Sequence, residues 1–344
     1  MPEDKTEQQQ QSPPTPEKIW KFSVISDLNG SYGSKTYSQD VAAAVKFITN
    51  ESTEIDFSIS TGDMVAGQKS HLDYLGMWKA FHSNVTRKLT ASKIPLYPSP
   101  GNHDASIGRA TERKHYLNSW SGENIPSIHP GFNLVKGVEQ NYPFSYAFTL
   151  GPALFIALDN TSINTFSDRT IVWLEDVLEK KKDLPNKFIY GHVPLLPFAL
   201  GRANDYNARG DSGFLNHMEE LFERYEVSVF FSGHSHVYYP GKRLGKTQYI
   251  SVPLLGGGPR RLLTKTRNEP RSEHGFLTVT YSESGELKIH SIASDNYSVI
   301  EDQELPSSID IPLKDYSDCR GCKNFPSSMF LDKSKRSVYY RRDL

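Results

Sequence analysis

Short apolar runs alternate with longer amphipathic segments along most of the chain, starting at Ile19. The apolar runs predict buried strands at residues 22–26, 57–60, 95–99, 153–158, 187–190 and 227–232. The amphipathic segments predict helices at residues 40–49, 71–89, 168–182 and 212–225, with Asp168 and Ser212 as N-caps. This alternation of strand and helix is typical of an α/β core.

Three later apolar runs, at residues 248–252, 276–281 and 287–292, follow one another without a helix between them. Turn residues such as Ser284-Gly285 separate them, so they predict a sheet with antiparallel members. Two sheets packed together and flanked by helices would accommodate both halves of the chain. We therefore expect an α/β fold with mixed sheets, in a domain that spans residues 19–300.

The two ends of the chain differ in composition from this domain. Residues 1–18 are polar and rich in Gln and Pro, which predicts a disordered lead or tether. The lead lacks the apolar region of a secretory signal, yet it resembles the tether of an exported or surface-anchored protein after processing, a location we favour slightly over the cytoplasm. Residues 301–344 predict an extended tail. Its Cys319 and Cys322 lack a second pair for zinc, so we expect a local disulfide or two idle thiols.

Charge and hydropathy exclude several classes of function. The chain of 344 residues has 39 Lys and Arg against 40 Asp and Glu, a net charge of −1. This balance gives no electrostatic footprint for long DNA or RNA. No apolar run approaches the roughly 18 residues that a membrane span needs. We therefore expect neither a long nucleic acid partner nor a transmembrane segment, while the oligomeric state stays open.

Metal-binding residue types follow five of the predicted strands. The segments read Ser26-Asp27-Leu28-Asn29-Gly30, Thr61-Gly62-Asp63-Met64, Pro100-Gly101-Asn102-His103-Asp104, Tyr190-Gly191-His192 and Ser232-Gly233-His234-Ser235-His236. Ligands of α/β sheets bind beyond the carboxyl ends of the strands, so these segments would bring oxygen and nitrogen donors to one place. A Gly-His-x-His match is expected only about 0.02 times by chance in this composition, so the pattern is informative.

The residue types indicate the chemistry. Carboxylate, amide and imidazole ligands together suit Mn, Fe, Zn or Co better than Ca. Two divalent cations about 3.5–4 Å apart need a bridging ligand, and a carboxylate provides one. Such a pair lowers the pKa of a bridging water and yields a hydroxide that can attack phosphorus at neutral pH. We expect two divalent or mixed-valence metal ions as cofactors.

In combination, these segments resemble the motifs of the calcineurin-like metallophosphoesterase superfamily, D-x-H, G-D, G-N-H-[DE], G-H and G-H-x-H, over about residues 20–293. The resemblance implies a four-layer αββα sandwich. It implies that Asp63 bridges two ions, that Asp27 and His236 hold the first, and that Asn102, His192 and His234 hold the second. It also implies that His103 lies beside the substrate, to stabilise its charge or protonate the leaving oxygen, and that Asp104 orients the His103 imidazole.

One position departs from the family pattern. Asn29 stands where the first motif usually has histidine, so either its amide oxygen is a weak ligand or water takes the position. The related purple acid phosphatases also lack that histidine but use a tyrosine three residues after the Gly-Asp aspartate. That position is Ala66 here, so a purple iron–tyrosinate centre is not predicted.

Substrate contacts are expected from loops around the metals. The segment 198–213 carries Arg202, Tyr206 and Arg209, and arginine forks fit phosphate oxygens while tyrosine can stack on a base or sugar. An ordinary exposed loop is the alternative. The glycine-rich segment 256–261 lacks the Lys-Ser/Thr ending of a P-loop, which favours a tight loop near the metals over a nucleotide site.

The sequence thus predicts a metal-dependent hydrolase of phosphate esters, in which a metal-bridging hydroxide attacks phosphorus in line. The expected partner is a small phosphorylated substrate, either a phosphomonoester, a phosphodiester or a nucleotide. The alternative is a degenerate metallophosphoesterase that binds a phosphorylated ligand or partner without turnover, which Asn29 motivates. A nuclease on long nucleic acid is disfavoured by the balanced charge.

Overall fold

The computed structural model describes residues 17–122, 132–162, 167–202, 212–241, 243–244, 246–264, 271–302, 305, 308–310 and 337–339. The helices are α1 (Gln39–Ile48), α2 (Tyr74–Asn84), α3 (Thr86–Ala91), α4 (Asn102–Ala105), α5 (Ala110–Ser119), α6 (Asp168–Lys180) and α7 (Ser212–Arg224), with a 3₁₀ turn η1 (Glu51–Thr53). The strands are β1 (Ile19–Ile25), β2 (Phe57–Ser60), β3 (Leu96–Pro98), β4 (Asn133–Leu134), β5 (Tyr146–Leu150), β6 (Ala153–Ala157), β7 (Asn186–Gly191), β8 (Val229–Ser232), β9 (Arg243–Leu244), β10 (Thr247–Ser251), β11 (Gly275–Ser282), β12 (Leu287–Ala293), β13 (Ser308–Asp310) and β14 (Ser337–Tyr339).

The strands form two mixed sheets and a small separate pair. The first sheet has the order β12-β11-β1-β2-β3, in which β1, β2 and β3 are parallel and β11 is antiparallel to both of its neighbours. The second has the order β4-β5-β6-β7-β8-β10-β9, with β6, β7, β8 and β10 parallel and antiparallel strands outside them. Strands β13 and β14 pair antiparallel with each other.

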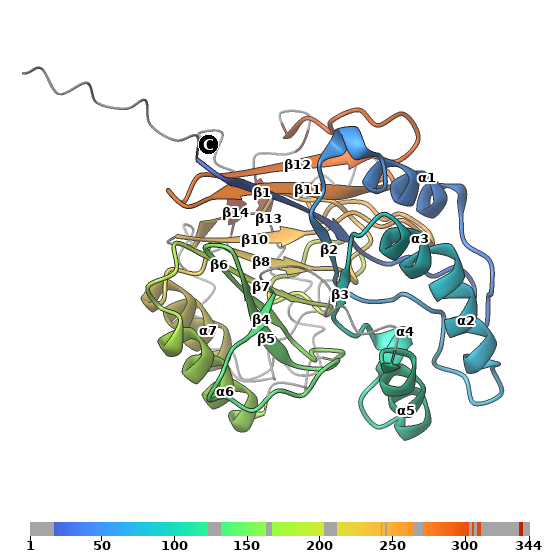
Figure 1. Ribbon diagram of the computed structural model, residues 1–344, viewed down its shortest axis with the longest axis horizontal. Helices are drawn as coiled ribbons and strands as arrows, with labels where there is room; N and C mark the ends of the chain where they lie inside the picture. Colours follow the sequence, from blue (N-terminus) through green and yellow to red (C-terminus); the bar gives the residue numbers. More distant parts are fainter. Residues whose placement is uncertain are drawn as a thin grey trace, which may run out of the picture.

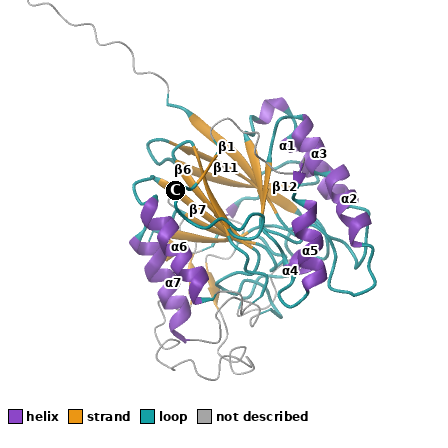
Figure 2. Ribbon diagram, turned by 60° about the horizontal axis from the view of Figure 1, so that its bottom comes forward, coloured by secondary structure: helices purple, strands orange, loops and turns teal. Residues whose placement is uncertain are grey.

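The two sheets face each other, and helices cover their outer faces (Figures 1 and 2). Helices α1, α2, α3 and α5 contribute to the core of the first sheet, and α6 and α7 contribute to that of the second. Successive side chains of a strand point to opposite faces of the sheet, so each strand contributes side chains to two layers of the core. In β7, Phe188 and Tyr190 lie in the core between the sheets, whereas Ile189 packs in the core beneath α6 and α7. The expected four-layer αββα sandwich is confirmed.

Aromatic side chains fill the layer between the sheets. The Phe22 ring on β1 lies 5.0 Å from that of Phe57 in the same sheet, and 5.3 Å from those of Phe155 and Phe188 in the other sheet. All four side chains are fully buried. Offset and edge-on aromatic pairs contribute about 0.5–1.5 kcal/mol each beyond the burial of their area. This layer therefore fixes the two sheets against each other.

Most predicted elements are present, and three details differ. The predicted helix at 71–89 is two helices, because the backbone of Val85 leaves helical geometry (φ −121°, ψ −76°). The N-cap of α6 is Ser167 rather than Asp168, since the Ser167 hydroxyl accepts a hydrogen bond from Thr170 N. The predicted strand at 248–252 joins the second sheet parallel to β8, while the next two strands pair antiparallel in the first sheet.

Most residues at the two ends of the chain lie outside the described part. Residues 1–16, Cys319 and Cys322 lie outside the described residues, so the predicted boundaries of the lead and tail stay predictions. Within the described part of the chain, no helix is both long enough and apolar enough to cross a bilayer.

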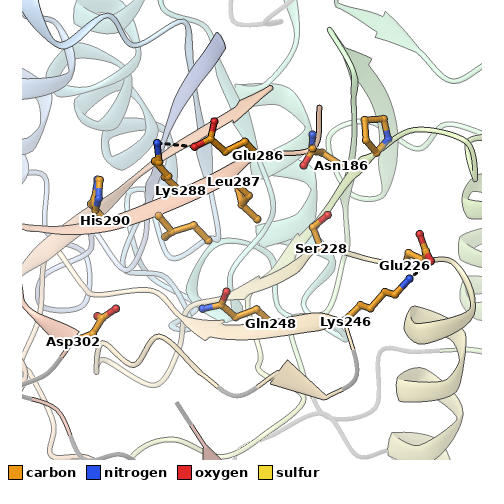
Figure 3. A pocket seen from close by; sticks show the side chains of 13 residues that line it. Asn186, Glu226, Ser228, Lys246, Gln248, Glu286, Leu287, Lys288, His290 and Asp302 are labelled. Atoms are coloured by element: carbon orange, nitrogen blue, oxygen red, sulfur yellow. Dashed lines mark hydrogen bonds and ion pairs between the residues drawn. The ribbon is translucent and has the colours of Figure 1, made fainter. Parts of the chain in front are cut away.

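The amino ends of the parallel strands border a cavity of about 680 Å³ (Figure 3). Asn186 at the start of β7 and Ser228 just before β8 line it. Its cations are paired with carboxylates: Lys246 with Glu226 and Lys288 with Glu286. This cavity therefore offers no clear positive charge for a phosphorylated ligand, and the metal-binding residue types lie at the opposite, carboxyl ends of the strands.

Candidate metal centre

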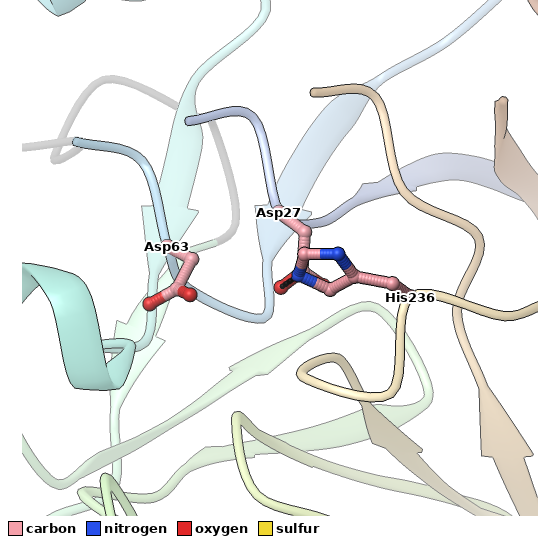
Figure 4. Close-up of side chains that lie close together, drawn as sticks. All are labelled: Asp27, Asp63 and His236. Atoms are coloured by element: carbon pink, nitrogen blue, oxygen red, sulfur yellow. Dashed lines mark ion pairs between the residues drawn. The ribbon is translucent and has the colours of Figure 1, made fainter. Parts of the chain in front are cut away.

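Three side chains beyond the carboxyl ends of the strands form a first group of metal-ligand types (Figure 4). Asp27 follows β1, Asp63 follows β2 and His236 follows β8. One ligand atom from each lies within 4.8 Å of the other two, and both aspartates are buried. His236 Nε2 is 3.2 Å from Asp27 Oδ1. Two carboxylates and an imidazole at these separations can bind one divalent cation.

A second group lies beside the first. Asn102 Oδ1 is 2.8 Å from His192 Nε2 and 2.9 Å from His234 Nδ1, and the two imidazole nitrogens are 3.2 Å apart. Asp63 Oδ2 is 3.4 Å from His192 Nε2. The Asp63 carboxylate therefore lies between the two groups, within 4.8 Å of the ligand atoms of the first and 3.4 Å from His192 of the second. This is the arrangement that a bridging ligand between two cations requires.

The backbone at the candidate ligands is unusual. Asp27, Asp63, His234 and His236 have positive φ angles of 48°, 55°, 65° and 53°. A left-handed conformation costs a residue with a side chain roughly 1–2 kcal/mol. Such strain is concentrated at functional sites, where the surrounding structure imposes it. Four strained residues from three loops point to a site whose side-chain directions matter more than local stability.

Glycines next to the ligands allow the loops to pack backbone against backbone. A Cβ atom on Gly62 would lie 2.5 Å from Gly101 N, and one on Gly101 would lie 2.1 Å from Asp63 N. Both distances are well below a normal contact. The glycines of the Gly-Asp and Gly-Asn-His segments are therefore required for the two loops to approach each other.

Two candidate histidine ligands are oriented by backbone carbonyls. His192 Nδ1 lies 2.9 Å from Thr61 O, and His236 Nδ1 lies 3.2 Å from Gly258 O. A carbonyl accepts, so each Nδ1 carries a proton, and Nε2 is the ring nitrogen that faces the site. The glycine-rich segment is thus a tight loop beside the candidate centre, as expected, and Gly256 N donates to Asp27 O at 2.7 Å.

The buried charges of the site are coupled. Burial opposes ionisation of Asp63, but the neighbouring His192 imidazole outweighs it and holds the Asp63 pKa well below its usual range. Burial also lowers the His192 pKa, but the Asp63 carboxylate overrides this and raises it to about 9. For Asp27, the effect of burial is outweighed by His236, so its pKa is also lowered. Both carboxylates are therefore anionic at neutral pH and provide the negative charge that a cation needs.

Asp104 has a different position from the one expected. Its Oδ1 accepts hydrogen bonds from Met64 N and Val65 N, and its Oδ2 accepts one from Gly101 N, each at 2.9 Å. Burial and the Asp63 charge raise its pKa to about 7. The expected contact with the His103 ring is not formed, because His103 Nδ1 has no hydrogen-bond partner among the described residues. Asp104 instead joins the Gly-Asp loop to the Gly-Asn-His loop.

Two further asparagines surround the centre. Asn29 is buried, and its Nδ2 donates to Val65 O at 3.4 Å, which leaves Oδ1 as the atom for metal binding, so its ligand role stays a prediction. Asn160 follows β6. It accepts a hydrogen bond from His192 N and donates one to Val193 O at 2.7 Å. Asn160 therefore holds the His192 loop in place.

A cavity of about 540 Å³ opens over the candidate centre. Asp63, His103 and His234 line it, together with Arg202 and Arg260. Arg202 was expected there, whereas Tyr206 and Arg209 lie outside the described residues.

Arg260 was noticed in the sequence only as part of the glycine-rich loop. Its Nη1 donates to His234 O at 3.0 Å and to Ser235 O at 3.2 Å. The guanidinium therefore braces the His234 loop while it also lines the cavity. Its adjacency to the glycines was the only sequence signal for this role.

Known proteins resemble this chain in sequence profile and in fold. The sequence profile described as calcineurin-like phosphoesterase matches residues 21–238. A search of curated protein sequences found no significant match. Among solved structures, a purple acid phosphatase, PPD1, from yellow lupin (Lupinus luteus) seeds has a TM-score of 0.59 at 16% identity, covering 83% of this chain and 53% of that chain. The present chain therefore spans about half the length of the lupin protein.

A second solved structure also has a similar fold. GAP50, the anchor in the inner membrane complex of Plasmodium, has a TM-score of 0.52 at 18% identity, covering 82% of this chain and 87% of that chain. At these identities the two structures show a shared fold.

Proposed function

We propose, since the chain belongs to the calcineurin-like phosphoesterase family, that it hydrolyses phosphate esters at a centre of two metal ions. The observation that carries the proposal is the position of the Asp63 carboxylate, which lies beside both groups of ligand-type side chains. Bound ions would supply Lewis acidity toward the phosphoryl oxygens and lower the pKa of water. The remaining tasks belong to residues of this chain.

The proposed ligands divide between the two groups. Asp27, Asp63 and His236 would hold the first ion, with Asn29 as a further, neutral ligand. The second ion would be held by Asn102, His192 and His234 together with the shared Asp63. The mixture of oxygen and nitrogen donors fits Mn, Fe, Zn or Co.

His103 is proposed to act on the leaving group. Its Nε2 is 4.0 Å from Asp63 Oδ2, and its side chain is 23% exposed in the wall of the cavity. An imidazole there can donate a proton to the oxygen that leaves phosphorus. Arg202 and Arg260, also in the cavity wall, would meet the remaining phosphate oxygens.

The substrate is proposed to be a small phosphorylated molecule. The cavity of about 540 Å³ lies within the usual range of small-molecule sites. The net charge of −1 offers no broad attraction for a long nucleic acid. The arginines favour a phosphomonoester or a nucleotide, because they can neutralise additional phosphate oxygens.

Metal analysis combined with a substrate panel tests the proposal. Protein reconstituted with manganese, zinc or iron should bind about two ions and release nitrophenol from p-nitrophenyl phosphate or its bis-ester. His192→Ala should lose this activity, while His71→Ala, which removes an exposed histidine, should retain it. Two bound ions with no product from either ester or from nucleotides would refute hydrolysis.

The second candidate is a phosphate-binding protein without turnover. Asn29 in place of the usual histidine favours it. One bound ion, no hydrolysis and retained binding of inorganic phosphate would support this alternative. Metal analysis combined with the ester and phosphate-binding assays therefore separates the two candidates.

A further inference from the structure

Among the described residues, the His103 imidazole lacks the hydrogen-bonded partner that usually orients a catalytic histidine. Its Nδ1 is buried and has no hydrogen-bond partner in the described part of the chain. Asp104 is the expected partner, but its carboxylate oxygens accept hydrogen bonds from three backbone N–H groups. An imidazole can rotate about two side-chain bonds, so another contact must set the direction of its Nε2.

Tyr32 provides such a contact. The centroids of the Tyr32 and His103 rings are 5.4 Å apart at an interplanar angle of 36°. The Lys69 Nζ lies 4.3 Å from the centroid of the Tyr32 ring. Aromatic pairs and cation–π contacts at these distances are each favourable. Tyr32 is 48% exposed and lines the cavity over the candidate centre, so it is not needed to fill the core.

The backbone fixes these three side chains relative to one another. Gly33 N, next to Tyr32, donates to Ala66 O at 2.9 Å, and Gly67 N donates to His103 O at 3.0 Å. Lys69 follows two residues later. The segments that carry Tyr32, Lys69 and His103 are therefore held together by main-chain hydrogen bonds, which keep the three side chains close to one another.

We propose that Tyr32, supported by Lys69, is a positioning residue that holds the His103 imidazole toward the leaving oxygen. The inference rests on the proposed function. As the bond from phosphorus to the leaving oxygen breaks, its electron pair goes to that oxygen, which takes the proton from His103 Nε2. Water supplies both the oxygen that forms the new bond to phosphorus and the proton that restores His103.

Leaving-group dependence gives the kinetic test. Phenolate is a poor leaving group, so its departure depends on proton donation by an acid. Nitrophenolate is a more stable anion and can leave with little help from a proton donor. Tyr32→Ala should therefore lower kcat roughly tenfold for a phenyl ester but less than about twofold for the matching nitrophenyl ester, with KM little changed. Tyr32→Phe should keep wild-type values, and Lys69→Met should fall between. The proposal would be overturned if Tyr32→Ala lowered kcat equally for both esters. It would also be overturned if Tyr32→Phe lowered kcat as much as Tyr32→Ala does.

Tyr297→Ala is the matched control. Tyr297 is 37% exposed, its ring lies 5.3 Å from that of Phe47, and it is not among the residues that line the site cavity. Its loss removes a comparable exposed tyrosine and aromatic contact. Tyr297→Ala should hydrolyse both esters at wild-type rates. A loss of kcat in Tyr297→Ala like that in Tyr32→Ala would mean that general destabilisation causes the Tyr32 effect, and it would contradict the proposal.

A spectroscopic measurement separates failure of the inference from failure of the proposed function. In protein with labelled histidines, the His103 ring signal should show a ring-current shift that Tyr32→Ala abolishes and Tyr32→Phe retains. The absence of this shift would show that the Tyr32 and His103 rings are not in contact, whatever the activity. If the wild-type protein shows the shift but hydrolyses no ester, the proposed function is refuted, and with it the catalytic role of the ring contact.

Discussion

At the scale of single residues, two hydroxyl groups connect the core of the first sheet to a candidate metal ligand. The Thr61 hydroxyl donates to Ser26 Oγ, and the Ser26 hydroxyl donates to Asp27 Oδ2, both at 2.6 Å. All three residues are buried. Groups behind a ligand fix its direction and tune its basicity, so this relay is expected to set the affinity of the first ion.

Replacing Ser26 by alanine tests the relay. We expect Ser26→Ala to weaken binding of the first ion about 10–100-fold, because the Asp27 carboxylate loses the donor that fixes it. Metal titration measures this directly. The control is Ser23→Ala, which removes a buried hydroxyl on β1 that lies 2.7 Å from Ser58 Oγ on β2. A similar loss of affinity in both variants would mean that destabilisation, not the relay, is responsible.

At the scale of elements, the site depends on two loops that touch through their backbones. Gly101→Ala would place a Cβ atom 2.1 Å from Asp63 N and 2.2 Å from Asp63 Oδ1. The loops must separate, which should cost about 1–3 kcal/mol of unfolding free energy and displace Asp63. Denaturant unfolding measures the cost, with Gly258→Ala as control because nothing lies within 4 Å of its added Cβ. Equal stability of the two variants contradicts the close approach.

The sequence predicted elements and motifs well where the signal is local. Apolar runs located β1, β2, β6, β7 and β8, and the small residues after them located the candidate ligands. Long-range information was missing. Nothing in the local pattern places β10 beside β8, and the weakly amphipathic α5 and the hairpin partner β5 were not predicted.

The same limit applies within the candidate site. A spacing motif does not reveal which neighbour a carboxylate faces, so Asp104 was expected at the His103 ring although it binds three backbone N–H groups. The Tyr32 ring against His103 joins segments that are far apart in the chain. Motifs therefore identify the groups that share a site, and tertiary contacts decide which group orients which.

At the scale of the whole molecule, the helical layer over the first sheet contains a buried histidine that couples stability to pH. His82 on α2 packs among Trp78, Phe81 and Trp120. Burial lowers its pKa to about 4, below the ordinary value of 6.5. The unfolded chain therefore binds this proton at a higher pH than the folded protein does, so acid favours unfolding.

The resulting pH dependence has a definite sign. Above about pH 6.5, His82 is mostly neutral in both the folded and the unfolded protein, so its protonation has little effect on stability. As the pH falls from 6.5 to 4, the free energy of unfolding should decrease by up to about 3 kcal/mol, because the unfolded chain takes up this proton before the folded protein does. His82→Leu should remove this part of the slope in denaturant unfolding across that range. The exposed His71→Ala should not. Parallel stability curves for His82→Leu and the wild type would show that His82 is not responsible.

The central claim is that one carboxylate serves two metal ions. Elemental analysis of three purified, metal-reconstituted proteins tests it most directly. We predict about two ions for the wild type, about one for His236→Ala, which removes a ligand of the first group alone, and less than one for Asp63→Asn, which weakens both groups. If Asp63→Asn retains as many ions as His236→Ala, Asp63 does not bridge and the account of the centre is wrong.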